Sequence, residues 1–288
     1  MKKSITKKII SLLLCTCLLF SLSVISFAAD SQKKAIDFVA LIETTGHASS
    51  YIETVKTQLL SEIKKIDTSL VDYRLAIVEY RDFTERTNIA DFAYKSSGFL
   101  TSIKSIEDYF DEITLSSFSN SSTCLFCTFY DCVKNLAFRD KCARGILVFG
   151  STKCDNPEPY TGYNFSDVYY AFDLIASGDA SECVNPIFSF NLGSSTELAN
   201  VYTNLSNYSG GTYNIFSPLS STFEHDLAVA IGSALNYVID NVEIIEDKPQ
   251  EDYFAQKLEK ILKTLPPVIK EIATPIFRLM IVLYNLLH

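Results

Sequence analysis

Cysteine is the residue type whose number and spacing could do the most chemistry in this sequence. The chain has eight cysteines, and two of them lie in an apolar run at the N-terminus. The other six are even in number, and in an exported protein that pattern predicts disulfides, although sequence alone does not choose the pairing. These six candidates are Cys124, Cys127, Cys132, Cys142, Cys154 and Cys183. The Cys124-Leu-Phe-Cys127 spacing also allows a redox pair or half of a zinc site, but no second CxxC follows, and disulfides remain the prediction.

Histidines are scarce, which limits nucleophilic catalysis. A Ser-His-Asp or Cys-His hydrolase needs a histidine beside its nucleophile, and only His47, His225 and His288 are present. His225 stands between two acidic residues at the expected start of a helix, which is typical of a solvated first turn. The sequence has no GxSxG elbow, GxGxxG turn or phosphate-binding loop. We therefore expect that the chain is not an enzyme.

The first 28 residues resemble a secretory signal peptide. Four lysines between Lys2 and Lys8 precede an apolar run from Ile9 to about Phe27, and small residues before Ala29 suit cleavage after Ala28. This predicts a secreted protein, with an export signal of Gram-positive bacterial character, and leaves surface association open. The net charge of −9 argues against a nucleic-acid partner, because phosphate binding requires clustered Lys and Arg.

Buried strands and amphipathic helices must position any site, and they alternate along the chain. Continuous apolar runs predict strands over Ala35–Ile42, Tyr73–Tyr80, Gly145–Phe149, Pro186–Asn191 and Thr212–Phe216, with an alternating edge strand over Ile89–Tyr94. Helical spacing predicts helices after Ser49 and Ser50, which could cap the first, and then near residues 100–110, 125–136, 168–175, 198–205 and 223–239. The expected fold class is α/β, a doubly wound and mostly parallel sheet flanked by helices, with its ligand site beyond the carboxyl ends of the strands.

Three segments resemble von Willebrand factor A (vWFA) domains. They are Phe38–Gly46 (FVALIETTG), the helix that opens Tyr51-Ile-Glu-Thr-Val, and Tyr73–Phe83 (YRLAIVEYRDF). Asn135–Arg139 before the GILVF strand and Tyr208–Tyr213 before the last helix add support. The resemblance runs from about Ala35 to Asn241 and implies a vWFA-like domain over residues 34–243.

The resemblance also implies a metal-ion-dependent adhesion site, and here the family's ligands are altered. The first Asp of the family's D-x-S/T-x-S motif corresponds to Glu43, the first hydroxyl is kept as Thr45, and the second becomes His47. The distal ligand falls near Asn120 or Ser121, and Gly150 or Ser151 replaces an expected Asp. Magnesium and calcium prefer hard oxygen ligands, so these changes predict a degenerate, metal-free site. Binding of Mg²⁺ or Ca²⁺ is the alternative.

The C-terminal segment is the second informative part of the chain. Residues 244–252 are acidic and polar, as in a linker, and residues 253–288 carry two amphipathic stripes separated by Pro266-Pro267. The last apolar run is shorter than the roughly 20 residues that a membrane-spanning helix needs. Self-association or attachment to a membrane surface is expected of residues 253–288.

Together these features predict a secreted, non-catalytic binding or adhesion module without a cofactor. It would hold a protein or glycan partner through the loops at the carboxyl ends of the sheet. The alternative is a structural or assembly subunit whose C-terminal helices drive oligomerisation or attachment to the cell surface.

Overall fold

A computed structural model of the 288-residue chain describes residues 33–82, 94–116, 122–140, 142–159, 161–176 and 185–241. The chain divides into two units, residues 1–243 and 244–288. The predicted signal peptide, the linker and the C-terminal helices lie outside the described residues. Within the described residues, no helix has the length and apolar character needed to cross a membrane.

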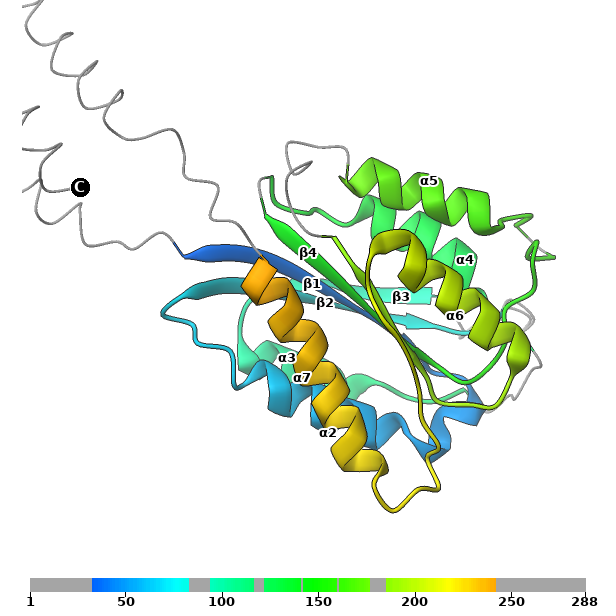
Figure 1. Cartoon of the computed structure of the whole chain (residues 1–288), viewed down its shortest axis with the longest axis horizontal. Coiled ribbons are helices and arrows are strands. Elements are labelled where there is room, and N and C mark those ends of the chain that lie inside the picture. The colour runs from blue at the N-terminus through cyan, green and yellow to red at the C-terminus, as the bar shows by residue number, and fades with distance from the viewer. Residues whose placement is uncertain are drawn as a thin grey trace, which may run out of the picture. The chain divides into compact units, whose positions relative to one another are not determined.

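Strands and helices alternate, as expected from the sequence, and form a single six-stranded sheet with helices on both faces (Figure 1). The strands are β1 (Lys34–Glu43), β2 (Val71–Tyr80), β3 (Tyr94–Leu100), β4 (Ala143–Gly150), β5 (Ile187–Asn191) and β6 (Tyr213–Ile215). The helices are η1 (Gly46–Ser50), α2 (Ile52–Ile63), α3 (Ile103–Glu112), α4 (Leu125–Cys127), the π-helical η3 (Thr128–Val133), α5 (Phe165–Ala176), α6 (Thr196–Ser209) and α7 (Phe223–Asn241).

The sheet has the order β3-β2-β1-β4-β5-β6, and all its neighbours are parallel except β2 and β3. This order is that of a doubly wound fold, in which the chain winds outward in one direction from β1 and in the other from β4. The predicted fold class, an α/β sheet of vWFA or Rossmann-like arrangement, is confirmed. The point where the winding reverses lies between β1 and β4.

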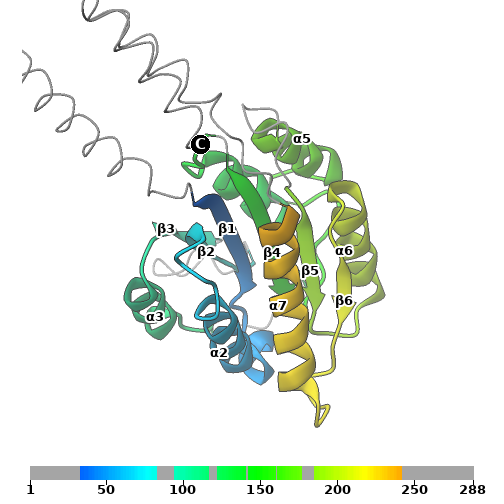
Figure 2. The ribbon, with the colours of Figure 1, turned by 60° about the vertical axis from the view of Figure 1, so that its left-hand side comes forward.

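Burial of both faces explains why the central strands read as continuous apolar runs. Alternate β1 residues face opposite layers: Phe38 and Ala40 join the core beneath α2, α3 and α7, whereas Val39 and Leu41 join the core beneath α4, α5 and α6. Figure 2 shows these two helical layers on either side of the sheet. Such packing holds the ends of β1 and β4 in fixed positions.

The edge strand β3 and the start of α2 differ from expectation. The edge strand was predicted over Ile89–Tyr94, of which 89–93 lie outside the described residues, but β3 begins at Tyr94 and continues to Leu100. It pairs with β2 through a register shift, and Gly98 has a φ of 65°, so this irregular strand lacks a period-two apolar pattern. The expected caps Ser49 and Ser50 lie in η1, and α2 follows Tyr51 without a side-chain cap.

Candidate functional site

The carboxyl ends of β1 and β4 meet where the winding of the sheet reverses, which is where doubly wound folds bind their ligands. β1 ends at Glu43 and β4 ends at Gly150, and the two strands are hydrogen-bonded neighbours. The loops that follow them, Thr44–Tyr51 and Ser151–Thr152, therefore lie side by side. This is the position of the site that the sequence predicted.

The Glu43 carboxylate fills this position and is fully buried. Its Oε2 accepts hydrogen bonds from the backbone N–H groups of Ser151 (2.6 Å) and Thr152 (3.0 Å) and from the hydroxyls of Tyr51 (3.0 Å) and Ser151 (3.3 Å). Its Oε1 accepts from the hydroxyls of Thr152 (2.5 Å) and Thr45. We call these residues, Glu43, Thr45, Tyr51, Ser151 and Thr152, the Glu43 cluster.

The donor set of the Glu43 cluster does not fit a divalent cation. A cation needs free oxygen lone pairs, but both carboxylate oxygens of Glu43 already accept bonds from the protein. Two of those donors are backbone N–H groups, which cannot turn away and would place partial positive charge against a metal ion. The extra methylene of Glu relative to Asp lets the carboxylate reach the β4 loop. In the described residues, no group of three or more His, Cys, Asp or Glu is arranged to hold a metal.

Two further tyrosines, Tyr80 and Tyr202, lie beside the Glu43 cluster in the interior of the fold. The Tyr80 hydroxyl donates to the carbonyl of Phe149 (3.0 Å) and lies 3.0 Å from the Tyr202 hydroxyl, and both rings are fully buried. Burial, with the nearby Glu43 charge, raises the pKa of Tyr51 well above its usual value, and burial does the same for Tyr80 and Tyr202. All three phenols therefore stay protonated at neutral pH and are hydrogen-bond donors.

Gly150 leaves room for this arrangement. A Cβ at this position would lie 2.3 Å from the Tyr80 hydroxyl, 2.6 Å from the Tyr202 hydroxyl and 3.0 Å from Glu43 Oε2. A carboxylate side chain at this position, as the family pattern leads one to expect, would require the two tyrosines and Glu43 to move. The absence of a side chain at Gly150 thus leaves space for the hydrogen-bonded Glu43 and for the two tyrosines.

The structure brings together three of the predicted site residues, Glu43, Thr45 and Ser151. His47, predicted at the second hydroxyl position, is exposed on η1 and makes none of the hydrogen bonds to Glu43 described above. The predicted Asn120 and Ser121 lie outside the described residues. Sequence reasoning missed Tyr51 and Thr152, although Thr152 directly follows Ser151 at the end of a predicted strand and could have been included on that ground.

A second buried carboxylate, Glu158, ties the loop after β4 to the start of α4. Its oxygens accept from the backbone N–H groups of Phe126 (2.7 Å) and Cys127 (3.1 and 3.2 Å) and from the Thr161 hydroxyl (2.9 Å). Burial raises the pKa of Glu158 to about 7, although these hydrogen bonds act to lower it. Glu158 therefore titrates near neutral pH, which distinguishes it from an ordinary surface carboxylate.

The predicted disulfides are not found among the cysteines that the structure describes. Cys183 lies outside the described residues, and the other five candidates are buried and form no disulfide: Cys124, Cys127, Cys132, Cys142 and Cys154. Cys124, Cys127, Cys132 and Cys154 belong to the core beneath α4, α5 and α6, whereas Cys142 contacts Asp37 at the amino end of the sheet. As small buried apolar residues they pack the cores beneath the helices.

Glu158 gives a prediction for the pH dependence of stability. Its pKa is about 7 in the folded protein and near 4.5 in the unfolded chain, so between these values the folded state binds more protons. Stability should therefore fall as pH rises from about 4.5 to 7.5, by up to roughly 3 kcal/mol from this group. Urea unfolding across this range measures it. Glu158→Gln should remove most of the slope, and an identical slope in the variant would contradict the assignment.

The comparisons with known proteins add little to this description. No protein-family model and no curated protein matches the chain. Among solved structures, the chain is similar to the crystal structure of the conserved hypothetical protein BatB from Bacteroides thetaiotaomicron. The identity is 9%, the TM-score is 0.46, and the match covers 70% of this chain and 99% of that chain.

Proposed function

We propose that this chain is an exported, non-catalytic binding module that holds a protein or glycan partner at the carboxyl edge of its sheet without a divalent cation. The observation that carries the proposal is the Glu43 cluster, which occupies the position where a doubly wound fold binds its ligand. A carboxylate whose two oxygens already accept six hydrogen bonds is not a free general base. It is also not an open metal ligand.

Exposed apolar side chains at and after β6 support contact with a partner. The loop between β6 and α7 lies at the same edge of the sheet (Figure 2), and it exposes Leu219 almost completely, with 94% of its surface accessible. Ile215, at the end of β6, is 60% exposed. Exposed apolar side chains on a loop are typical of contact surfaces when they gather at one place.

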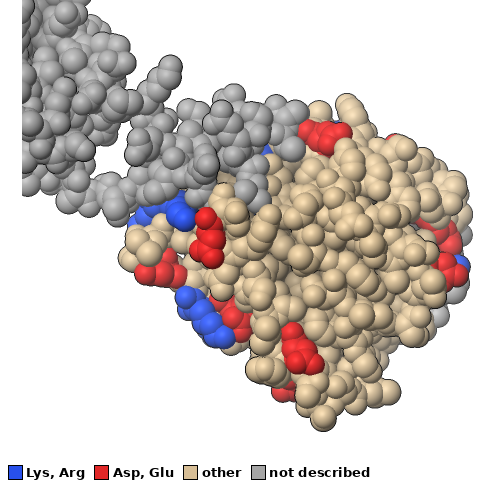
Figure 3. All heavy atoms as spheres, viewed as in Figure 1, with Lys and Arg blue, Asp and Glu red and all other residues tan. Residues whose placement is uncertain are grey.

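The charge distribution also argues against a strongly acidic partner. Residues 154–247 contain no Lys or Arg, and this stretch includes α5, α6, β6 and α7. Figure 3 shows that the face formed largely by these elements carries few charged side chains. Strongly acidic polymers would find no basic patch on these described elements.

The proposal can be tested by applying the purified chain to an array of extracellular proteins and glycans in buffer that contains EDTA. We expect saturable binding that EDTA does not weaken and that Leu219→Ser weakens at least about tenfold, since a central apolar contact is worth about 1–3 kcal/mol. Val229→Ser, at an exposed position on α7, is the matched control and should bind as the wild type does.

Other outcomes would count against the proposal. Binding that requires Mg²⁺ or Ca²⁺, or binding that Leu219→Ser leaves unchanged, would contradict it. Deletion of residues 250–288 should leave partner binding intact. If that deletion abolished binding and self-association together, the assembly role would be favoured instead.

A further inference from the structure

A cavity lies at the opposite, amino-terminal edge of the sheet, away from the Glu43 cluster. It has a volume of about 240 Å³ and lies between the segment after η3, the start of β4 and the end of α5. Its lining residues are Lys134, Leu136, Ala137, Phe138, Arg144, Leu174 and Ile175. The cavity therefore combines two cations with an apolar wall.

Arg144 is unusual because it is a buried cation without an acidic hydrogen-bond partner in the described structure. Only 5% of its surface is exposed. Its guanidinium donates to the backbone carbonyls of Ile175 and of Arg139 (3.0 Å) and lies 5.1 Å from the centre of the Phe138 ring. Its Nε has no hydrogen-bond partner among the described residues. Burying a charge in this way is unfavourable unless an opposite charge approaches.

Lys134, the other cation of the cavity, is similar. Its Nζ lies 3.2 Å from the Tyr130 hydroxyl and 4.5 Å from the centre of the same ring. Neither Lys134 nor Arg144 forms an ion pair with a described carboxylate. Many other described cations do form such pairs: Lys56, Lys64, Lys65, Arg74, Lys95, Lys104, Arg139 and Lys153.

The carboxylate that lies opposite Arg144 in the sheet does not neutralise the Arg144 charge. Asp37 on β1 lies opposite Arg144 on β4, but its oxygens accept two hydrogen bonds from the Arg74 side chain and two from Arg139. Asp37 thus serves two other arginines, and the nearby Asp72 pairs with Arg139 as well. Neither carboxylate forms an ion pair with Arg144.

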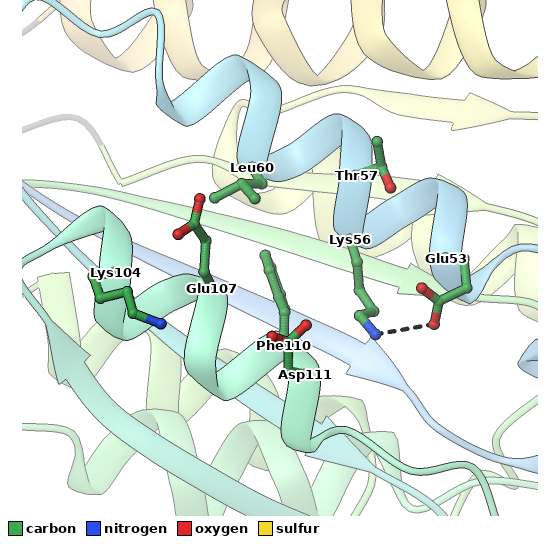
Figure 4. A pocket seen from close by; sticks show the side chains of 8 residues that line it. All are labelled: Glu53, Lys56, Thr57, Leu60, Lys104, Glu107, Phe110 and Asp111. Atoms are coloured by element: carbon green, nitrogen blue, oxygen red, sulfur yellow. Dashed lines mark hydrogen bonds and ion pairs between the residues drawn. The ribbon is translucent and has the colours of Figure 1, made fainter.

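A cavity between α2 and α3 provides a contrast (Figure 4). It is slightly larger, about 310 Å³, and three acids and two lysines line it, with Lys56 donating to Glu53 at 2.9 Å. Its second lysine, Lys104, pairs with Asp108. Positive charge in that cavity is therefore balanced by the protein itself, and an anion would meet an excess of carboxylates.

We propose that the cavity at the amino-terminal edge binds a small organic carboxylate with a short apolar group. The carboxylate would lie between Lys134 and Arg144, and the apolar group would contact Leu136, Leu174 and Ile175. A volume of about 240 Å³ is below the range of about 300–1,000 Å³ usual for drug-sized ligands, so the ligand is small. The apolar wall distinguishes it from an inorganic anion.

The test is a titration of the purified full chain with acetate, butyrate, hexanoate and inorganic phosphate at constant pH and ionic strength, followed by calorimetry and by NMR. We expect saturable binding with a Kd on the order of 1 mM or tighter for hexanoate. Affinity should increase from acetate to hexanoate and be weakest for phosphate. Lys134→Gln should weaken hexanoate binding about fivefold or more, whereas Lys104→Gln, in the α2–α3 cavity, should not change it.

Three results would overturn the proposal. The first is no saturable response to hexanoate in wild-type protein whose folding is verified by its NMR spectrum. The second is equal binding of phosphate and hexanoate, which would indicate simple charge attraction. The third is equal weakening by Lys134→Gln and Lys104→Gln. Because Lys134 is half-buried at the surface rather than in a core, its substitution tests the site without removing the buried Arg144.

Discussion

Replacing Glu43 with alanine is expected to lower the free energy of unfolding by about 3–5 kcal/mol. The substitution removes the carboxylate that accepts from the backbone N–H groups of Ser151 and Thr152 and from the Tyr51 hydroxyl. These donors are held by β4 and by the start of α2, so they cannot all find new partners. Urea unfolding, followed by circular dichroism, measures the loss.

Glu43→Gln separates the loss of charge from the loss of the acceptor. Its amide oxygen can still accept from the two backbone N–H groups, while the hydroxyls of Thr45 and Thr152 can rotate to accept from its amide nitrogen. We expect a smaller loss, about 1–2 kcal/mol. Glu112→Ala, at an exposed position at the end of α3, is the control and should stay within about 0.5 kcal/mol. Equal effects of Glu43→Ala and Glu112→Ala would contradict the structural role of Glu43.

Asp37→Ala is expected to have the second large effect, also about 3–5 kcal/mol, because removing one partner of a buried ion pair leaves the other uncompensated. Asp37 is fully buried, and it accepts from Arg74 at 2.6 and 2.9 Å and from Arg139 at 2.8 and 2.9 Å. Burial alone would raise the pKa of Asp37, but the two arginines hold it below its usual value. Its contribution should therefore persist to low pH and be lost as the pH falls below about 4.

Asp72 provides the matched control for Asp37. It pairs with the same Arg139, at 2.6 Å, but 59% of its side chain is exposed. Water and salt screen such a pair, so Asp72→Ala should cost less than about 1 kcal/mol. The two variants can be compared by urea unfolding at neutral pH. If Asp72→Ala cost as much as Asp37→Ala, burial would not be what makes the Asp37 pairs strong.

Most of the fold could be predicted from the sequence because its strands are buried on both faces. The run Ala35–Ile42 has no polar interruption except Asp37, and the helical spacing near residues 198–205 lies within α6. The sequence did not indicate the strand from Tyr94 to Leu100 because Lys95, Ser96 and Ser97 give no apolar alternation. The register shift in its pairing with β2 depends on contacts that no local pattern reveals.

The structure brings together Glu43, Thr45 and Ser151, as the sequence predicted, but the donors that surround Glu43 were not foreseen. The resemblance to the vWFA motif indicates which metal ligands are absent, here an Asp and a second hydroxyl. It does not indicate which groups take their place. Tyr51 comes from the start of α2 and Thr152 from the loop after β4, and only their approach to Glu43 in space identifies them as donors. The described cysteines form no disulfide, and the sixth candidate, Cys183, lies outside the described residues.

The central claim is that the protein's own donors occupy the place of a cation. Urea unfolding of the full chain in millimolar Mg²⁺ or Ca²⁺, compared with EDTA, tests it most directly. A cation bound at a concentration 100 times its Kd would add about 2.7 kcal/mol to the free energy of unfolding. The hydrogen-bonded Glu43 predicts that the curves in cation and in EDTA coincide within about 0.5 kcal/mol. A stabilisation of 2 kcal/mol or so by either cation, abolished in Glu43→Gln, would contradict it.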